Sequence, residues 1–584
     1  MARPTPASSL VAPKGRLITL LVIMAVGFGA IVVRLTFVQG FSARRYADYG
    51  ASQRIVNISL PAERGAILDR NLAELALSTR RQTVWADPKS IKDPAAAARI
   101  LAPLLETSES ALRAKLSTDA SFVYLARKVE DRMAAAVKSM KIEGVGFLEE
   151  PKRIVPSEEL AAPVIGQVGT DDEGLSGVEA QYEKELTGRP GELLVERDPG
   201  GNDIAAGLRQ LTPSARGDNL VLTLDRAMQY EAERALAASI VSSKAKGGMA
   251  VVTDPRTGEI LAMANLQAGK NGGPPVPTAD NMAVTRVFEP GSTNKVVTVA
   301  AALEEGIVDP STRMNVNDSL RVADTTFGDA EPHPPMSWTT ADIVAQSSNV
   351  GTIQIAQRLG KARISNYLDA FGLTDRTGLR FPGESGGLIP EVDKWSGTSI
   401  GSIPIGQGVA VTAVQMLSAY NAMANGGTYV APSLLKTTVS ADGKTHPAKA
   451  PATHRVVSAE TAGEVTKMLT GVVSDGTGTA ARIEGYTVAG KTGTARKPSE
   501  TKAGYSDNYM ASFVGFVPAE APRLSAIVVL DEPTPYFGGI VSAPVFAAIA
   551  GFGIRHFQIP ARPAPAPTGA IAAGATPGLP PTKP

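Results

Sequence analysis

Three short clusters of hydroxyl, amine and amide side chains, far apart in the sequence, could together carry out acyl transfer. They are Ser292-Thr293-Asn294-Lys295, Ser347-Ser348-Asn349 and Lys491-Thr492-Gly493-Thr494. A serine hydroxyl becomes a strong nucleophile when a neighbouring base takes its proton, and none of the three clusters contains histidine, the most frequent base. The chemistry that they predict is therefore a serine nucleophile activated by lysine.

The first cluster stands at the start of a predicted helix. Ser292 follows Glu289-Pro290-Gly291, and an apolar run continues after Lys295 as far as Gly306, where a helix would end. A spacing of three places Ser292 and Lys295 on one helix face. Near the amino end, the backbone N–H of Ser292 and the helix dipole favour the negative charge that develops on an attacked carbonyl. We therefore predict Ser292 as the nucleophile and Lys295 as its base.

The other two clusters supply what this base needs. Lys295 can accept a proton at neutral pH only if burial or a second cation lowers its pKa from about 10.4. Lys491 could be that cation and could also attract a substrate carboxylate, while Gly493 would let an extended substrate lie against its strand. Ser347 offers a hydroxyl that can relay a proton to a leaving group, and Asn349 an amide that can bind a peptide carbonyl.

Composition excludes several other chemistries. The 584-residue chain has no cysteine, which excludes disulfides, thiolate zinc sites, iron–sulfur clusters and a cysteine nucleophile. Its four histidines lie past the midpoint, and we interpret each as a surface or loop residue: His333, His446, His454 and His556. The net charge of +1, without a long basic run, argues against nucleic-acid binding. The predicted chemistry requires no metal and no organic cofactor.

One membrane-spanning helix is predicted near the start of the chain. Residues 17–33 are apolar and uncharged, and at about 1.5 Å per residue they cover about 25 Å, which residues 35–38 can extend to a bilayer core. The basic residues before the run place the short tail, 1–16, in the cytoplasm and everything after residue 40 outside. A cleaved signal peptide is the alternative, but no convincing cleavage site follows the run.

The rest of the chain divides by its patterns. Residues 39–215 mix short β-like runs with Ala-rich helical stretches, which predicts an α+β module. A larger domain, 216–558, opens with a strand, a helix and a hairpin. Residues 559–584 are almost all Pro, Ala, Gly and Thr, a composition that cannot bury a core and predicts a disordered tail.

Each cluster alone occurs by chance in many proteins. Their order along the chain and their sequence context, however, connect them to a known family. Together they resemble the penicillin-recognising serine transferases, and the surrounding sequence resembles the class B penicillin-binding proteins over most of the chain. RGAILDRN at 64–71 and GLSGVE at 174–179 resemble pedestal motifs of that family, although Leu72 stands where a glycine is common. FEPGSTNK, the glycine-rich segment from residue 406, and FGGIVSAPVF from residue 537 are also family-like, and the last resembles the division-specific (septal) branch.

The resemblance implies a fold and a reaction. The fold is α+β: a single transmembrane helix (17–38), a pedestal or dimerisation-like domain, and a penicillin-binding transpeptidase domain with helices packed on an antiparallel sheet. Ser292 would attack the bond between two D-alanines of a peptidoglycan stem peptide, release the last one and form an acyl-enzyme that an amine resolves. The backbone N–H groups of Ser292 and Thr494 would form the oxyanion hole, and Thr492 and Thr494 would bind the substrate carboxylate.

The same resemblance implies inhibitors and partners. β-Lactams would acylate Ser292, because they mimic the D-alanyl terminus. A SEDS-type glycan polymerase and divisome membrane proteins would contact the membrane helix and pedestal at the cytoplasmic membrane. Other readings within the family stay open: an elongation-type enzyme, a β-lactam sensor, or a non-catalytic divisome scaffold. A hydrolase that uses water as acceptor would leave the pedestal unexplained, and a bifunctional class A enzyme would need a further glycan-polymerising domain.

Two motifs from other enzyme classes also occur. Residues 485–492 fit the spacing of a phosphate-binding loop, but the residues inside it favour a strand, and Gly493 interrupts the helix that should follow. Residues 383–387, GESGG, match a hydrolase nucleophile motif around Ser385, but they lie between Pro382 and an irregular segment rather than between a strand and a helix. We interpret the first as a strand and the second as a surface turn.

Overall fold

The computed structural model describes residues 14–41, 44–45, 49–50, 54–157, 159–198, 203–499 and 504–561. The predicted cytoplasmic tail, 1–16, and the predicted disordered tail, 559–584, lie almost wholly outside these residues. The chain divides into two compact units, Met1–Ala62 with Arg189–Ala215 and Glu63–Gly188 with Arg216–Pro584. The domain limits given above, 39–215 and 216–558, stay predictions.

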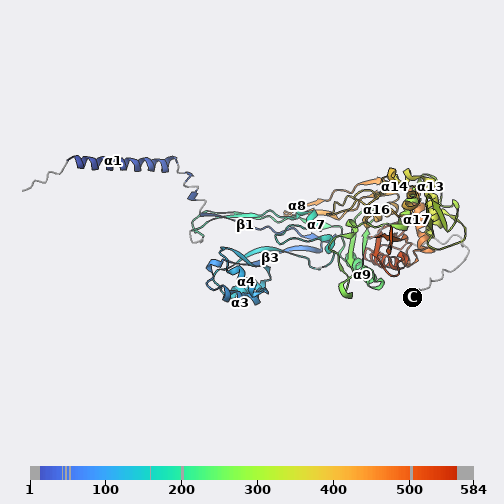
Figure 1. Ribbon diagram of the computed structural model, residues 1–584, viewed down its shortest axis with the longest axis horizontal. Helices are drawn as coiled ribbons and strands as arrows, with labels where there is room; N and C mark the ends of the chain where they lie inside the picture. The colour runs from blue at the N-terminus through green and yellow to red at the C-terminus, as the bar shows by residue number, and fades with distance from the viewer. Residues whose placement is uncertain are drawn as a thin grey trace, which may run out of the picture. The chain divides into compact units, whose positions relative to one another are not determined.

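The predicted membrane segment is helical. Helix α1 spans Lys14–Thr36, and a π-helical turn, Phe37–Phe41, follows it (Figure 1). The span Lys14–Gly40 has a mean hydropathy of 2.4 in its most apolar window, and none of that window is buried. A second span, Gly538–His556, meets the same length and hydropathy criteria but is mostly buried, as a core helix is. Helix α1 is thus long and apolar enough to cross a membrane.

The first unit contains a three-stranded antiparallel sheet in the order β1-β6-β7. Its strands are β1 Ile55–Leu60, β6 Gly191–Glu196 and β7 Arg209–Thr212. Ile55 pairs with Glu196 and Leu60 with Gly191, so the strand that follows the membrane segment is held by a segment from much later in the chain. Val195, in the central strand, is buried.

The second unit contains a seven-stranded sheet in the order β18-β17-β8-β2-β3-β4, with β5 also paired to β3. The strands are β2 Ile67–Leu68, β3 Glu74–Ala86, β4 Val123–Val129, β5 Val145–Ile154, β8 Asn219–Leu222, β17 Leu435–Val439 and β18 Thr445–Pro447. β2 runs parallel to β8, and the other pairs are antiparallel. The strand expected at the start of the larger domain therefore exists, but it pairs with a pedestal strand, β2, on one side and with β17 on the other.

Three helices pack beside β3 and β4 around a small core of their own (Figure 1). They are α3 Pro94–Leu104, α4 Glu109–Leu116 and α5 Asp131–Ser139. The first two begin where the sequence provides a cap, because the side chains of Asp93 and Ser108 accept hydrogen bonds from backbone N–H groups of the first turn. Leu101, Leu112 and Leu116 fill the core.

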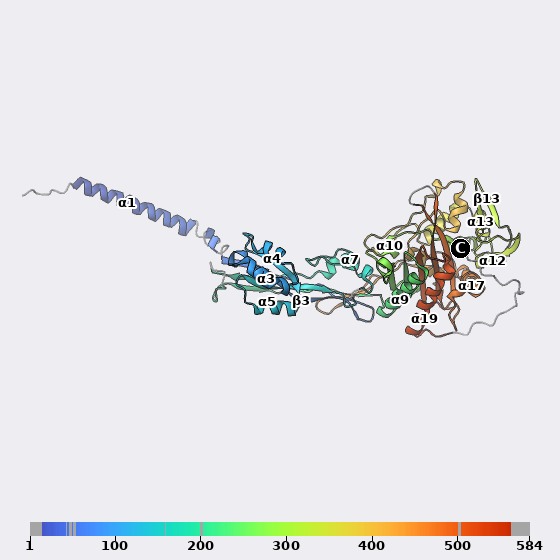
Figure 2. The same ribbon diagram turned by 60° about the horizontal axis from the view of Figure 1, so that its bottom comes forward.

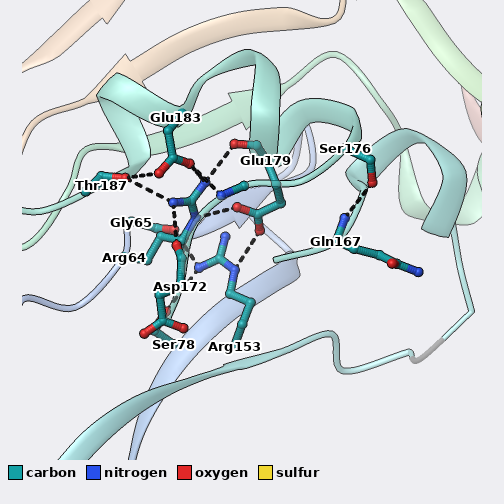
Figure 3. Close-up of polar contacts among 12 residues, drawn as sticks. Arg64, Gly65, Ser78, Arg153, Gln167, Asp172, Ser176, Glu179, Glu183 and Thr187 are labelled. Atoms are coloured by element: carbon teal, nitrogen blue, oxygen red, sulfur yellow. Dashed lines mark hydrogen bonds and ion pairs between the residues drawn. The ribbon is translucent and has the colours of Figure 1, made fainter. Parts of the chain in front are cut away.

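The two pedestal motifs meet in a buried cluster of ion pairs, which we call the arginine–glutamate cluster (Arg64, Arg153, Glu179 and Glu183; Figure 3). Arg64 binds both carboxylates, and Arg153 Nε lies 2.7 Å from Glu179 Oε1. Arg153 also donates to the Gly65 carbonyl at 2.7 Å, which ties the cluster to the first motif. The side chains of Arg64, Arg153 and Glu179 are almost fully buried.

A tight turn follows the first motif at the position where glycine is common. Leu72 has φ +68, in the left-handed region that favours glycine, and its side chain is exposed. The carboxylate of Asp69 accepts from the backbone N–H groups of Asn71 and Ala73 and so holds the turn. The turn forms although this chain lacks the glycine.

A six-stranded antiparallel sheet forms the centre of the second unit, in the order β11-β10-β9-β22-β21-β20. Its strands are β9 Gly247–Thr253, β10 Ile260–Gln267, β11 Val276–Pro277, β20 Ala489–Pro498, β21 Tyr505–Val517 and β22 Leu524–Asp531. The third cluster of the sequence, which starts at Lys491, therefore lies in the edge strand β20. This confirms the predicted antiparallel sheet.

Helices cover both faces of this sheet, because alternate residues of its central strands enter two different cores. On one face lie α9 Arg226–Ser243 and α19 Ala543–His556, side by side (Figure 2). On the other lie α11 Lys295–Glu304, α16 Ala413–Ala424 and α17 Ala459–Ser474. Val251 of β9 faces the second group, and Val252 faces the first. The predicted α+β architecture is confirmed.

Shorter elements complete the second unit. The helices are α6 Ala162–Ile165, α7 Gly177–Gln181, α8 Glu183–Leu186, α10 Met282–Thr285, α12 Thr340–Ala345, α13 Asn349–Leu359, α14 Lys361–Ala370, α15 Ser399–Ser402 and α18 Gly538–Val541. The two-stranded pairs are β12 Arg313–Val316 with β15 Met336–Thr339, β13 Ser319–Val322 with β14 Thr325–Gly328, and β16 Thr428–Val430 with β19 Thr453–Arg455. Ser347 and Ser348 of the second sequence cluster lie between α12 and α13, and Asn349 is the first residue of α13.

Candidate active site

Ser292 lies on a single 3₁₀ turn, Gly291–Asn294, that runs directly into α11. Residues three apart eclipse each other in such a turn, so Ser292 and Lys295 lie on one side. Ser292 is partly exposed, whereas Thr293 and Asn294 are fully buried. The predicted helix start is present, with the difference that the α-helix begins at Lys295 because its first turn is tightened.

The turn Gly291–Asn294, which we call the nucleophile turn because it carries the predicted nucleophile, is held in place by the family-like segment that starts at residue 406. Gly291 N–H donates to the Gly406 carbonyl at 3.0 Å, and the buried hydroxyl of Tyr420 donates to the Thr293 carbonyl at 2.9 Å. Gly406 has φ +78, and a Cβ there would lie 2.2 Å from the Gly291 carbonyl oxygen. Only glycine fits this contact, so the segment fixes the backbone that carries Ser292.

Lys295 is buried, at 1% exposure, and its amine points at the second cluster. Its Nζ donates to the backbone carbonyl of Ser347 and lies 3.4 Å from the Ser347 hydroxyl. Burial lowers the pKa of Lys295 to about 7, against a smaller opposing effect of the Asp329 carboxylate. A substantial fraction of this amine is therefore uncharged at neutral pH.

Ser347 joins the two lysines. Its hydroxyl accepts a hydrogen bond from Lys491 Nζ at 2.8 Å, in addition to its contacts with Lys295. Its backbone has φ +59, which a non-glycine residue adopts at a cost of about 1–2 kcal/mol. This left-handed residue turns the chain between α12 and α13, so that the Ser347 side chain meets both amines.

Lys491 is completely buried in β20. Burial, and then the positive charge of Lys295, hold its pKa well below the usual value for lysine. Its Nζ also lies 3.3 Å from the Thr492 carbonyl. The structure thus brings Lys295, Ser347 and Lys491 into one hydrogen-bonded cluster, which we call the lysine–serine cluster.

The strand that carries Lys491 passes close to the nucleophile turn. A Cβ on Gly493 would lie 2.3 Å from Ser512 Oγ and 3.0 Å from the Pro290 carbonyl oxygen, so only glycine allows this approach. The Thr494 hydroxyl accepts from Gly538 N–H at 3.2 Å, and the Thr492 hydroxyl lies 2.7 Å from that of Thr477. Gly493 and Thr494 therefore lie at the contact with the turn, whereas Thr492 bonds to Thr477.

Asn349 has a structural partner at the first position of α13. Its side-chain amide donates to the Gly328 carbonyl at 2.7 Å. The preceding Ser348 caps α13 by accepting from Gly351 N–H and donates to the Asp329 carboxylate at 2.7 Å. The second cluster is thus fixed to the segment after β14, which the sequence did not single out.

Several site neighbours escaped prediction. Asp329, Tyr420 and the pair Glu289–Tyr505 reach the three clusters only through tertiary contacts. The Tyr505 hydroxyl lies 3.0 Å from Glu289 Oε2, just before the nucleophile turn, and burial raises the pKa of the Glu289 carboxyl. The sequence signal for Glu289 and Tyr420 was that both lie in family-like segments, to which no role in the site could be assigned from the sequence.

The two motifs from other enzyme classes do not form their sites. Lys491 and Thr492 lie within β20, where a phosphate-binding loop would require a loop that leads into a helix. Ser385 lies in an irregular segment, and its hydroxyl accepts from Gly387 N–H at 3.2 Å. The strand interpretation is confirmed; around Ser385 the turn ends at Gly383, and Ser385 itself is half-buried in irregular chain rather than in a surface turn. Among the described residues, no group of three or more His, Asp or Glu side chains is arranged to hold a metal ion.

Comparison with known proteins agrees with this geometry. Residues 248–551 match the Penicillin binding protein transpeptidase domain, and residues 59–222 match the Penicillin-binding Protein dimerisation domain. The chain is 35% identical to Penicillin-binding protein PbpB of Mycobacterium tuberculosis, over 91% of this chain and 84% of that protein. It is 32% identical to Peptidoglycan D,D-transpeptidase FtsI of Escherichia coli, over 92% of this chain and 91% of that protein.

Solved structures show the same likeness. Penicillin binding protein 3 from Mycobacterium tuberculosis, crystallised in complex with aztreonam, superposes with a TM-score of 0.68 at 32% identity, covering 87% of this chain and 98% of that one. The resemblance inferred from the three clusters is confirmed. The chain therefore belongs to the class B penicillin-binding proteins of the septal type, a family of serine-type peptidoglycan D,D-transpeptidases.

Proposed function

We propose that this chain cross-links peptidoglycan stem peptides through an acyl-enzyme on Ser292, in the cell wall laid down at the division septum. The observation that supports this most strongly is the lysine–serine cluster, in which Ser347 bonds to both Lys295 and Lys491. Two buried amines, one of them three residues after the partly exposed Ser292 and on the same side of its turn, provide a base at neutral pH without histidine.

The acylation step uses the uncharged fraction of Lys295. Its amine takes the hydroxyl proton of Ser292, and the Ser292 oxygen attacks the carbonyl of the penultimate D-alanine of the donor stem. The backbone N–H groups of Ser292 and Thr494 would stabilise the oxyanion. A Cβ on Gly291 would lie 3.3 Å from the Thr494 carbonyl oxygen, so this part of β20 is next to the nucleophile turn.

Collapse of the tetrahedral intermediate requires a proton on the leaving nitrogen. Lys295 now carries the proton taken from Ser292, and Ser347 contacts its amine, so the hydroxyl of Ser347 can pass a proton to the departing D-alanine. The C–N bond breaks, D-alanine leaves, and the ester remains on Ser292. An amine of an acceptor stem then attacks the ester, loses its proton along the reverse path, and restores the Ser292 hydroxyl.

Substrate recognition falls to β20 and to the start of α13. The amine of Lys491 and the hydroxyls of Thr492 and Thr494 would bind the terminal carboxylate of the donor, whose negative charge would favour the protonated form of Lys491. Gly493 keeps the strand free of a side chain, and the amide of Asn349 would bind a peptide carbonyl of the stem. β-Lactams would acylate Ser292 at the same place.

The remaining assignments concern location and partners. Helix α1 would anchor the chain in the cytoplasmic membrane with a short cytoplasmic tail, 1–16, and the catalytic domain outside, which its length and hydropathy support. The pedestal, 39–215, the transpeptidase domain, 216–558, and a disordered tail, 559–584, complete the layout. A SEDS-type glycan polymerase and divisome membrane proteins would bind the helix and pedestal.

Labelling with a fluorescent penicillin, followed by a cross-linking assay with stem-peptide substrates, tests this function. We expect the full-length protein to be labelled, Ser292→Ala to lose both label and cross-links, and Ser385→Ala to keep both. Labelling of the wild type without repeated turnover would instead indicate a β-lactam sensor. Unchanged labelling of Ser292→Ala would overturn the assignment of the nucleophile.

A further inference from the structure

A histidine outside the three clusters is connected to the second of them through one carboxylate. The segment between β14 and β15 packs against the start of α13, where Asp329 accepts hydrogen bonds from Ser348 Oγ at 2.7 Å and Val350 N–H at 2.9 Å. The same Asp329 Oδ2 that binds Ser348 lies 3.0 Å from His333 Nε2. The Asp329 side chain is almost fully buried, and that of His333 is mostly buried.

Both ring nitrogens of His333 face oxygens that can only accept. Nε2 faces the Asp329 carboxylate, and Nδ1 lies 2.7 Å from the Pro334 carbonyl oxygen. A carbonyl and an ionised carboxylate have no hydrogen to give, so both nitrogens must carry one. The contacts therefore fit the charged imidazolium, whereas either neutral tautomer would leave a ring lone pair against an oxygen.

The surroundings of the ring favour the same form. Burial lowers the pKa of His333, but the Pro334 carbonyl and the Asp329 carboxylate outweigh it, and the pKa is raised above 6.5. Asp318, at the turn before β13, adds a further negative charge. The Trp338 ring of β15 lies 4.8 Å from the His333 ring and carries no charge. The side chains from α13 that meet Asp329 are uncharged as well.

The charge of His333 matters to the lysine–serine cluster in two ways. Asp329 accepts a hydrogen bond from Ser348, which directly follows the left-handed Ser347. If the Asp329 side chain becomes more mobile, the turn that orients the Ser347 hydroxyl becomes more mobile as well. The Asp329 carboxylate also acts on Lys295 in the direction of keeping its proton, and an imidazolium beside Asp329 opposes this. Loss of the ring proton therefore weakens the hold of Asp329 on Ser348 and also strengthens the tendency of the Asp329 carboxylate to keep the proton on Lys295.

We propose that His333, as an imidazolium, is a positioning residue that holds Asp329 against Ser348, so that acylation of Ser292 declines when the ring loses its proton at alkaline pH. This inference rests on the proposed acyl-enzyme at Ser292. His333 itself touches neither Ser292 nor the lysines in the hydrogen bonds of the described residues, and it acts through Asp329.

The test is the pH profile of acylation for the full-length protein in detergent micelles, from about pH 6 to about pH 9, with a chromogenic β-lactam. His333→Gln can keep a hydrogen bond to Asp329 but cannot titrate. His333→Ala removes the donor. His454→Gln is the matched control, since His454 bonds to the Ala370 carbonyl from β19. In parallel, NMR of histidine-labelled protein follows His333, identified by the signal missing from His333→Gln.

We expect wild type and His454→Gln to share a decline at alkaline pH whose midpoint equals the NMR midpoint of His333. His333→Gln should lose that decline and acylate roughly threefold to tenfold more slowly at lower pH, and His333→Ala should lose about tenfold or more, since charged hydrogen bonds are about twice as strong as neutral ones. A residue with a merely structural role would lower thermal stability without moving the profile.

Two results would overturn the inference. One is a His333→Gln profile that superimposes on the wild type after scaling. The other is an NMR signature of a neutral ring across the whole range, which can be read on the wild type even if a variant fails to fold. These outcomes differ from failure of the proposed function, in which the wild type would take no β-lactam at any pH.

Discussion

The chain buries basic side chains in two places and pairs them with carboxylates in only one. In the arginine–glutamate cluster, Arg64 and Arg153 share Glu179, and Glu183 gives Arg64 a second carboxylate. In the lysine–serine cluster, Lys295 and Lys491 have hydroxyl and carbonyl partners, and no salt bridge to either amine is present among the described residues. Both clusters join segments that are distant in the sequence.

The difference separates a structural use of charge from a chemical one. An arginine keeps its proton in proteins, so burying it requires a carboxylate beside it, and the pair then fixes how two segments meet. A lysine without a carboxylate loses its proton instead, and burial lowers the pKa of Lys295 to about 7. The lysine–serine cluster can therefore accept protons, whereas the arginine–glutamate cluster can only stabilise the fold.

The largest expected effect comes from removing an unpaired lysine. Lys295→Met should lower the acylation rate constant about a thousandfold, because general-base catalysis contributes about 10²–10⁴-fold. It should change the free energy of unfolding by less than about 1.5 kcal/mol, since methionine fills a similar volume and no salt bridge is broken. Stopped-flow acylation and urea unfolding measure the two quantities.

A paired lysine on the same strand as Lys491 provides the control. Lys497 lies 2.6 Å from Asp531 Oδ1 and 2.8 Å from Glu532 Oε1. Lys497→Met should leave the acylation rate constant within about threefold of the wild type, because a salt-bridged amine near the end of β20 takes no part in proton transfer. Equal losses in Lys497→Met and Lys295→Met would contradict the distinction between the clusters.

The second effect falls on stability. Glu179→Ala leaves Arg64 and Arg153 buried without their shared carboxylate and should lower the free energy of unfolding by about 3–5 kcal/mol. Urea unfolding measures this change. The exposed pair Glu130–Arg132 gives a control, in which Glu130→Ala should cost less than about 1 kcal/mol. If the two variants unfold alike, the cluster does not hold the motifs together.

The third effect tests the approach of β20 to the nucleophile turn. Gly493→Ala places a methyl group 2.3 Å from Ser512 Oγ and should lower the acylation rate constant about tenfold or more, as overpacking costs about 1–3 kcal/mol. Adding Ser512→Ala removes the nearest clash and should restore part of the rate. No recovery in the double variant would indicate that the Pro290 carbonyl, at 3.0 Å, sets the limit.

The smallest effect concerns the turn in the first pedestal motif. Leu72→Gly should raise the free energy of unfolding by about 0.5–1 kcal/mol, because glycine relieves a left-handed backbone and the exposed leucine loses little burial. Leu175 is also exposed, but its φ is not positive. Leu175→Gly should therefore be neutral or destabilising, and stabilisation of both variants would remove the backbone explanation.

The sequence predicted what depends on local pattern. The spacing of Ser292 and Lys295, the apolar run after them, and the β-like stretch around Lys491 are local features, and the structure has a helix start and a strand there. The α+β architecture followed from the family resemblance. The roles given to the individual site residues stay predictions until the variants are measured.

What escaped prediction depends on tertiary contacts. The partners of β8 are β2 and β17, from both sides of it in the sequence, and no local pattern specifies them. Asp329 meets Ser348 only because β14 and β15 fold the chain back onto α13. The left-handed Ser347 was also hidden, because serine has no strong preference for that conformation, and the pairing of Arg64 with Glu179 required the fold.

The acylation rate constant of Ser292 as a function of pH tests most directly whether an uncharged Lys295 is the base. As pH rises through the lowered pKa of Lys295, the neutral amine forms, so the rate constant should rise with a midpoint near pH 7, before the decline expected when His333 loses its proton. The rise should be absent from Lys295→Met and present in Lys497→Met. A rate constant that increases only towards pH 10, as for an ordinary lysine at about 10.4, would contradict the account.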